Sequence, residues 1–302
     1  MSRPPEDGSP RPEPTPPVAP VRELHPAAAP AGSACATCPV HHAGNLIRLG
    51  VNMKSWDYVV ALAGNPNTGK STVFNALTGL RQHTGNWPGK TVARAEGGFS
   101  YRDARYKLVD LPGTYSLLST STDEEIARDF ILFGRPDVTV VVADATQLER
   151  NLNLVLQVLE ITDRAIVCVN LIDEAERAGL QVDERALARE LGVPVVPTAA
   201  RSRRGLDELL ARIAEMAAGE TPTRPRRIEG GNRVLQRAVE ELAGAIQRDY
   251  PNLPNARWVA LRLLDGDERL ARAVESGELA DLARSSTSIA EPTPSPAQGI
   301  AS

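Results

Sequence analysis

The sequence has few cysteines and no long apolar run, and each absence excludes a class of protein. Three cysteines in 302 residues are too few for a small secreted scaffold held by disulfides. No stretch approaches the roughly 18 consecutive apolar residues that a membrane-spanning helix needs. The start is rich in proline and lacks the apolar segment of a secretory signal peptide. We therefore expect a soluble, cytoplasmic chain.

Positive charge is not in excess either. The 34 lysines and arginines are outnumbered by 38 acidic residues, which gives a net charge of −4. Such a balance provides no general attraction to nucleic acid or to anionic lipid. Clustered arginines occur at Arg201, Arg203, Arg204, Arg224, Arg226 and Arg227. They lack the interleaved aromatic residues of a nucleic-acid module, so they fit a solvated surface better.

Large apolar side chains are scarce at both ends of the chain. Residues 1–50 and 285–302 are dominated by small and polar residues and proline. Segments of this kind cannot bury enough surface to offset the entropy lost on ordering. We predict a disordered N-terminal extension and a disordered tail, with no internal repeat between them.

The middle of the chain alternates short apolar runs with longer amphipathic segments. We predict strands at 58–63, 93–100, 105–109, 138–143, 165–169 and 194–197. We predict helices at 70–79, 123–133, 149–160, 183–191 and 206–217. A hairpin turn at 101–104 would join the second and third strands. The alternation predicts an α/β fold, a mostly parallel sheet flanked by helices over residues 55–220.

A second, smaller unit follows a linker. The linker, 221–227, combines prolines with like charges. Beyond it, apolar residues share one helical face, and they are Val234, Leu235, Ala238, Val239, Leu242 and Ile246. A second apolar segment at 258–264 and a last helix at 267–283 complete a predicted all-helical domain over 228–284.

The segment 64–71 matches G-x-x-x-x-G-K-[ST], the loop that holds nucleotide phosphates. It stands between a predicted strand and a predicted helix, which is the context that the motif requires. Backbone N–H groups of such a loop cradle phosphate oxygens, the lysine reaches the β- and γ-phosphates, and the serine binds magnesium. The phosphate-binding residues that we predict are Gly64, Asn65, Asn67, Thr68, Gly69, Lys70, Ser71 and Thr72.

A later N-x-x-D motif indicates which base is bound. Asn170 and Asp173 follow the predicted strand 165–169. An aspartate at this place can accept hydrogen bonds from N1–H and the 2-amino group of guanine, and adenine has no such pair of donors. Asn170 would support the loop and the base edge. Three small residues after the last strand could add a backbone N–H to the guanine carbonyl, and they are Thr198, Ala199 and Ala200.

Two further segments predict a magnesium-dependent switch. Asp110 follows the strand 105–109 and would hold magnesium through water, while the N–H of Gly113 would meet the γ-phosphate. Thr91 lies between the phosphate loop and Asp110, so its hydroxyl could join Ser71 and Asp110 in the magnesium sphere. Thr114 follows Gly113 where Ras-type enzymes have a glutamine that orients water. We therefore expect hydrolysis that is slow or that relies on another device.

A cysteine–histidine element lies in the N-terminal extension. Two thiolates and an imidazole could bind zinc or iron, and the four residues concerned are Cys35, Cys38, His41 and His42. No second C-x-x-C completes the site, so exposed and redox-labile cysteines are the alternative. Cys168 falls in a predicted buried strand and fits a small core residue.

Together these segments resemble the cytoplasmic GTPase region and helical domain of FeoB-type ferrous iron transporters. The resemblance covers about 55–285, and the segments that carry it are 64–79, 85–91, 110–117, 123–129, 170–175 and 257–267. The stretch Gly85-Asn86-Trp87-Pro88-Gly89 is particularly selective for this family. The resemblance implies a Ras-like P-loop GTPase fold followed by a GDI-like helical domain that favours the GDP-bound state.

The resemblance also implies a monovalent cation and a membrane partner. In potassium-activated relatives, the residue that matches Asn67 binds potassium beside the phosphates, and the backbone around Asn86 and Trp87 lends carbonyls to it. Such a cation would stabilise developing charge without an arginine finger. Family members continue into a membrane domain, so a separate FeoB-like permease subunit is the expected partner, with this chain peripheral to the inner face of the plasma membrane.

Two other functions remain open from the sequence. One is a stand-alone GTPase that regulates ribosome or RNA assembly, and the other is a nucleotide-binding partner with negligible turnover, since the glutamine is absent.

Overall fold

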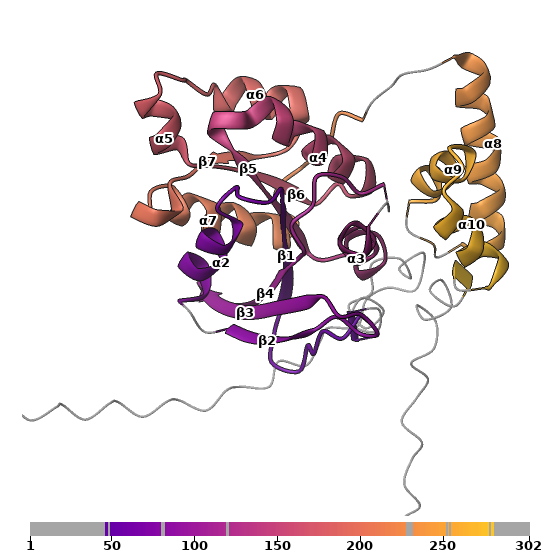
Figure 1. Ribbon diagram of the computed structural model, residues 1–302, viewed down its shortest axis with the longest axis horizontal. Coiled ribbons are helices and arrows are strands. Elements are labelled where there is room, and N and C mark those ends of the chain that lie inside the picture. Colours follow the sequence, from indigo (N-terminus) through magenta and orange to yellow (C-terminus); the bar gives the residue numbers. More distant parts are fainter. Residues whose placement is uncertain are drawn as a thin grey trace, which may run out of the picture. The chain divides into compact units, whose positions relative to one another are not determined.

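The computed structural model describes residues 46–280, apart from 48, 80, 81, 119, 120, 228–231, 252, 254 and 278. Its centre is a seven-stranded sheet in the order β2-β3-β4-β1-β5-β6-β7 (Figure 1). The strands are β1 (Tyr58–Gly64), β2 (Gln82–Asn86), β3 (Ala93–Tyr101), β4 (Ala104–Asp110), β5 (Val138–Asp144), β6 (Ala165–Asn170) and β7 (Val195–Pro197). Strands β4, β1, β5, β6 and β7 are parallel, and β2 and β3 run antiparallel. The mostly parallel sheet and the hairpin at 101–104 are thereby confirmed.

Helices cover both faces of the sheet. They are α2 (Lys70–Thr78), α3 (Thr122–Asp129), α4 (Leu148–Ile161), α5 (Ile172–Arg177), α6 (Glu184–Leu191) and α7 (Leu206–Ala217). Successive strand residues point to opposite faces, and β1 shows this clearly. Val60 and Leu62 pack in one core with residues of α2 and α7. Val59 and Ala61 pack in the other, with residues of α3 and α4. Burial on both faces explains the near-continuous apolar runs of the central strands.

Two of the predicted helices differ from those in the structure, and the structure has two elements that were not predicted. The helix expected at 123–133 is α3 followed by a π-helical turn, Phe130–Gly134, whose five residues are all buried. Five consecutive buried residues are more than one face of an α-helix can direct at a core. The last predicted helix, 267–283, ends at Glu275 in α10, because Gly277 takes a positive φ of 77°. Strand β2 and the short helix α5 were not predicted.

The folded part of the chain begins before residue 50. Leu46, which the composition assigned to the disordered extension, is fully buried, and Leu46 and Leu49 lie against Gly134 in the π-helical turn. The guanidinium of Arg94 donates to the carbonyls of Leu49 and Gly50 at 3.0 and 3.1 Å. The prediction for 1–50 therefore fails at its C-terminal end.

The structure describes three named helices after the linker. They are α8 (Arg233–Asp249), α9 (Ala256–Leu264) and α10 (Glu268–Glu275). Among the helices of the described residues, none is long and apolar enough to cross a membrane. The face predicted for α8 is only partly correct. Val239 and Ile246 are buried in the core cluster, whereas Val234 is 72% exposed.

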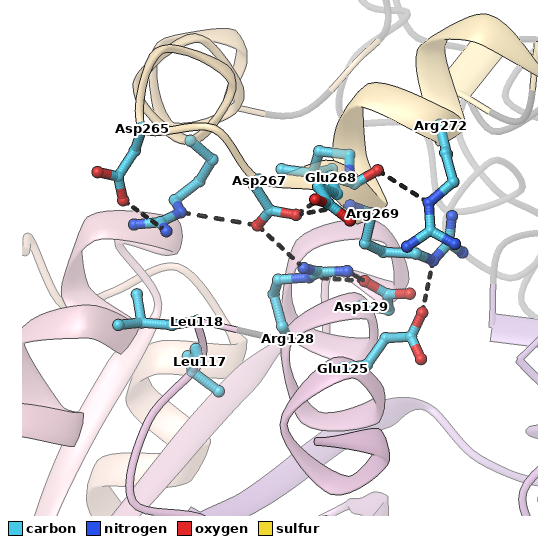
Figure 2. Close-up of polar contacts among 12 residues, drawn as sticks. Leu117, Leu118, Glu125, Arg128, Asp129, Asp265, Asp267, Glu268, Arg269 and Arg272 are labelled. Carbon is cyan, nitrogen blue, oxygen red and sulfur yellow. Dashed lines mark hydrogen bonds and ion pairs between the residues drawn. The ribbon is translucent and has the colours of Figure 1, made fainter. Parts of the chain in front are cut away.

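Ion pairs join α3 to α10 (Figure 2). The Nε of Arg269 lies 2.5 Å from Oε1 of Glu125. The buried guanidinium of Arg128 lies 2.8 Å from Oδ1 of Asp129 and 3.5 Å from Oδ2 of Asp267. A fully buried charge needs such partners, so the helical unit is held to α3 by charge as well as by packing.

Candidate functional site

The loop between β1 and α2 is shaped by positive φ angles and internal bonds. Gly69 has a φ of 78°, and Asn67 has one of 66° with an exposed side chain. The hydroxyl of the buried Thr68 donates to the carbonyl of Asn65 at 2.9 Å. Helix α2 begins at Lys70, so its first N–H groups open onto the loop, as an anion site requires.

The remaining residues of the predicted phosphate set lie at the ends of this loop. Gly64 is the last residue of β1, and Ser71 and Thr72 are exposed in the first turn of α2. Their hydroxyls are therefore accessible beside the loop. The chain places them together because the strand, the loop and the helix are contiguous.

Lys70, at the start of α2, and Asp110, at the end of β4, form an ion pair. The Nζ of Lys70 contacts Oδ1 of Asp110 and donates to the carbonyl of Leu111 at 2.8 Å. The register sets Asp110, at the end of β4, opposite Leu62 in β1. Burial raises the pKa of the Asp110 carboxyl above its ordinary value, and Lys70 opposes that rise. The predicted lysine and magnesium aspartate thus lie side by side.

Asn170 connects the N-x-x-D motif to the phosphate loop. Its Nδ2 donates to the carbonyl of Thr68 at 3.0 Å. Its Oδ1 accepts from the Thr198 hydroxyl at 3.2 Å and from the N–H of Ala200 at 3.1 Å. Asn170 is fully buried, and its amide is engaged on both sides. It therefore braces the loop, which is one of the two roles expected of it, and its role at the base edge stays a prediction.

Asp173 lies in the first turn of α5 and is only partly buried. Its carboxylate is 3.4 Å from the Nη2 of Arg177, a loose pair in solvent that is worth little. Ala199 and Ala200 are buried after β7, and Thr198 donates its N–H to the carbonyl of Val169. The structure gathers the predicted base-binding residues at the carboxyl ends of β6 and β7, where ligands of such sheets bind.

Asn86, Trp87 and Thr91 lie at the end of β2 and in the loop that joins it to β3. Asn86 pairs with Ala93 at the end of the hairpin. The Trp87 ring is buried and packs edge-on against Phe130 at 5.5 Å, and its carbonyl accepts from the N–H of Lys90. Thr91 is exposed. In the part of the chain that the structure describes, no hydrogen bond joins it to Ser71 or Asp110.

Lys90 ties that loop to helix α3. Its Nζ lies 2.9 Å from Oε2 of Glu125, the carboxylate that also pairs with Arg269. Burial raises the pKa of Glu125, but hydrogen bonds from Lys90 and Arg269 lower it more, so the pKa ends below its ordinary value. Sequence reasoning did not find this link, because no motif marks a pair 35 residues apart.

The segment after Gly113 is closed on itself. Thr114 is buried, and its hydroxyl donates to the carbonyl of Ser116 at 2.6 Å. The N–H of Thr114 donates to the carbonyl of Gly64 at 3.3 Å, which keeps Gly113 beside the loop. With its hydroxyl used in this turn, Thr114 is not placed to orient a water as a glutamine would.

The cysteine–histidine element, Cys35 to His42, lies outside the described residues. Within the described residues, no group of three or more metal-binding side chains of the kinds histidine, cysteine, aspartate or glutamate is present. Cys168 is buried, its sulfur lies 3.1 Å from the Thr198 hydroxyl, and burial raises the pKa of its thiol to about 12. It is a core residue, as expected.

We expect Gly69→Ala to weaken both the loop and the fold. The positive φ at Gly69 disfavours any residue with a Cβ by about 1–2 kcal/mol. An added Cβ would also lie 2.4 Å from Nδ2 of Asn170, which would push that amide off the Thr68 carbonyl. We expect a total loss of about 2–4 kcal/mol in the free energy of unfolding, measured by urea denaturation.

Gly79→Ala is the matched control for this change. Gly79 also has a positive φ, 62°, but no atom lies within 4 Å of an added Cβ. It should show the backbone cost alone. Equal losses for the two variants would contradict the steric role that we give to Asn170.

Comparisons with known proteins agree with this geometry. Residues 58–213 match the family described as ferrous iron transport protein B, and residues 232–293 match the FeoB cytosolic helical domain. The Fe(2+) transporter FeoB of Salmonella typhimurium is 43% identical over 212 residues, which are 69% of this chain and 27% of that protein. The chain thus spans about a quarter of the length of the curated relatives it matches.

Solved structures give the same result. The cytosolic domain of the T. maritima FeoB iron transporter in a GDP form is 37% identical, with a TM-score of 0.66, over 78% of this chain and 88% of that chain. Its GMPPNP form is 38% identical, with the same TM-score and coverage. The predicted fold, a P-loop G domain followed by a helical domain, is therefore confirmed.

Proposed function

Because the chain belongs to the family of ferrous iron transport protein B, we propose that it binds GTP and hydrolyses it to GDP and phosphate, as a switch that serves ferrous iron uptake. The observation that carries the proposal is the Asn170 amide, which joins the guanine-recognition motif to the phosphate loop at Thr68. A nucleotide whose phosphates lie in the loop would then have its base at Asp173. The GDP and GMPPNP forms of the T. maritima relative support the choice of ligand.

Each residue of the site would have its own role in binding the nucleotide. The backbone N–H groups of 64–70, apart from Pro66, which has none, would bind the phosphates. Lys70 would move from Asp110 to the β- and γ-phosphates. The Asp173 carboxylate would accept two hydrogen bonds from guanine. Gly113 would donate to the γ-phosphate, since the bond between Thr114 and Gly64 holds it beside the loop. Binding of triphosphate would in this way reorder the segments that follow Gly113 and precede Thr91.

The donor set fits a hard divalent cation. Ser71 offers an accessible hydroxyl and Asp110 a carboxylate, and oxygen donors of this kind suit magnesium. Thr91 could join them when its loop closes. Magnesium would neutralise charge on the phosphate oxygens. The release of Asp110 from Lys70 would leave its carboxylate free to take part.

A monovalent cation would compensate for the glutamine that Thr114 replaces. We propose Asn67 as its side-chain ligand, because its amide is exposed on the phosphate loop, with backbone carbonyls near Asn86 and Trp87 as further ligands. The Trp87 carbonyl already accepts a hydrogen bond from the N–H of Lys90. Its second lone pair would therefore bind the cation.

We expect wild-type phosphate release to be faster in potassium than in sodium by about tenfold or more, since a cation beside the phosphates stabilises the transition state. Asn67→Ala should remove that difference and keep the affinity for a fluorescent GDP analogue within about threefold. Equal wild-type rates in the two salts would count against the potassium role but not against GTP binding. The absence of any GTP hydrolysis would overturn the proposed function itself.

The proposed iron-linked role includes a membrane partner. The chain would act with a FeoB-like membrane permease; the curated relative is named an Fe(2+) transporter. The alternative, a regulator of RNA assembly, is not favoured by the arginines. Arg204, Arg226 and Arg227 pair with the carboxylates of Glu176, Glu190 and Asp163 at 2.7, 2.5 and 2.6 Å. A positive surface for nucleic acid is weakened by each such pair.

A further inference from the structure

Two side chains of helix α4 contact the segment 114–118: Arg150 lies over the Tyr115 ring at 4.6 Å, and Gln157 hydrogen-bonds to the segment. The Oε1 of Gln157 accepts from the N–H of Leu117 at 2.7 Å and from the Ser116 hydroxyl at 3.2 Å. The Ser116 hydroxyl accepts in turn from the N–H of Leu118 at 3.0 Å. The segment makes its other side-chain bonds within itself, between Thr114 and Ser116. Gln157 therefore supplies the side-chain hydrogen bonds that join this segment to α4, in addition to the backbone bond from Thr114 to Gly64 and the buried side chain of Leu117.

The position of this segment matters because of what precedes it. It starts directly after Gly113, whose N–H is proposed to meet the γ-phosphate. A displacement of the chain at Leu117 would travel through a short, internally bonded turn to Gly113. Preorganised donors stabilise a transition state only when they are held in place before the reaction.

The same helix also anchors the helical unit. The Nδ2 of Asn255 donates to the carbonyls of Glu160 and Ile161, at 2.6 and 3.0 Å, in the last turn of α4. Gln157 lies about one helical turn earlier. An apolar groove of about 270 Å³ lies beside Gln157, and it is lined by Leu117 and Leu118 and, from the helical unit, by Trp258 and Leu261.

We propose that Gln157 is a positioning residue for GTP hydrolysis, which holds the turn 114–118 so that Gly113 faces the γ-phosphate. The inference rests on the proposed function. Gln157 touches no phosphate and acts only through the Leu117 N–H and the Ser116 hydroxyl. Gln157 and the two carbonyls that accept from Asn255 lie on one helix, so α4 gives the helical unit a fixed reference to this turn.

Gln157→Leu tests the proposal, because leucine keeps the volume and removes the acceptor. We expect its rate of GTP hydrolysis at saturating GTP to fall by about tenfold, because two partly buried hydrogen bonds lose their acceptor, while the affinity for a fluorescent GDP analogue stays within about twofold. Gln157→Glu keeps an oxygen acceptor at the same place and should restore most of the rate. Gln236→Leu is the matched control, a glutamine on the helical side of the same groove.

Amide hydrogen exchange gives a second reading that needs no nucleotide. In Gln157→Leu, the Leu117 amide should exchange faster, and in Gln157→Glu and Gln236→Leu it should exchange as in wild type. Unchanged hydrolysis in Gln157→Leu, or a Gln157→Glu variant as slow as Gln157→Leu, would overturn the role proposed for Gln157. In that case GTP hydrolysis by the wild-type chain would still support the proposed function. A wild-type chain that hydrolyses no GTP would overturn both, even with the exchange pattern intact.

Discussion

Lys70→Ala is expected to lower the affinity for GTP by at least about 100-fold. Removing one partner of a buried charge pair costs about 2–5 kcal/mol, and each 1.4 kcal/mol corresponds to a factor of ten. Lys70 is partly buried at the start of α2, and its ammonium has only the Asp110 carboxylate and the Leu111 carbonyl as partners in the described part of the chain. It is thus positioned to transfer to the phosphates without a large movement of its backbone.

The measurement is titration of a fluorescent GTP analogue with magnesium present. Lys54→Ala is the control, because Lys54 is exposed and lies well outside the loop; it should leave the affinity unchanged. Far-UV circular dichroism should show that Lys70→Ala is folded. An affinity within tenfold of wild type in a folded Lys70→Ala chain would contradict the phosphate role of this lysine.

Asp173→Asn is expected to reverse the preference for the base. The aspartate accepts two hydrogen bonds from guanine, and asparagine can accept only one while presenting an N–H to the second donor. A mismatch between the hydrogen bonds of a buried site and those of its ligand can lower selectivity for that ligand by a factor of about 10⁴ or more. Since Asp173 is only partly buried, we expect a smaller loss for GTP, about 100- to 1,000-fold.

The reversal should also show as a gain. Xanthine has a carbonyl where guanine has its 2-amino group, so it can accept from the asparagine N–H, and XTP should bind the variant more tightly than GTP does. Asp103→Asn is the matched control, an exposed aspartate in the turn between β3 and β4. If Asp173→Asn kept the wild-type ratio of GTP to XTP affinity, the base would have to be recognised elsewhere.

Local motifs predicted the parts of the site that depend on contiguous sequence. The phosphate loop could be placed because the apolar run before Gly64 and the helical pattern after Lys70 fix its context. Asp110 and Asn170 were found because each ends an apolar strand, and the ends of parallel strands meet at one edge of a sheet. The described contacts of Lys70 with Asp110, and of Asn170 with Thr68, agree with that reasoning. Their roles toward a ligand remain predictions.

The remainder depends on contacts between distant segments. Strand β2 has the sequence Gln-His-Thr-Gly-Asn, which has no apolar alternation, and it forms because β3 offers a free edge. The π-helical turn at Phe130–Gly134 could not be foreseen without knowing that Leu46 and Leu49 pack on it. Gln157 has no sequence signal, since a single glutamine on an amphipathic helix is ordinary until its partner, Leu117, is seen.

The packed segment 46–57 also bears on where this protein can be cut. It lies before residue 58, where the match to the family begins, yet Leu46 and Val51 are fully buried. Lys107 donates to the carbonyl of Asn52 at 3.0 Å, and Arg94 binds the turn just before it. A chain trimmed at the family boundary would therefore expose a core surface and remove the backbone carbonyls that Lys107 and Arg94 bind, although both would keep their ion pairs with Glu96. Affinity tags and protease sites should be placed before Leu46, because the folded domain begins before residue 58, where the family match begins.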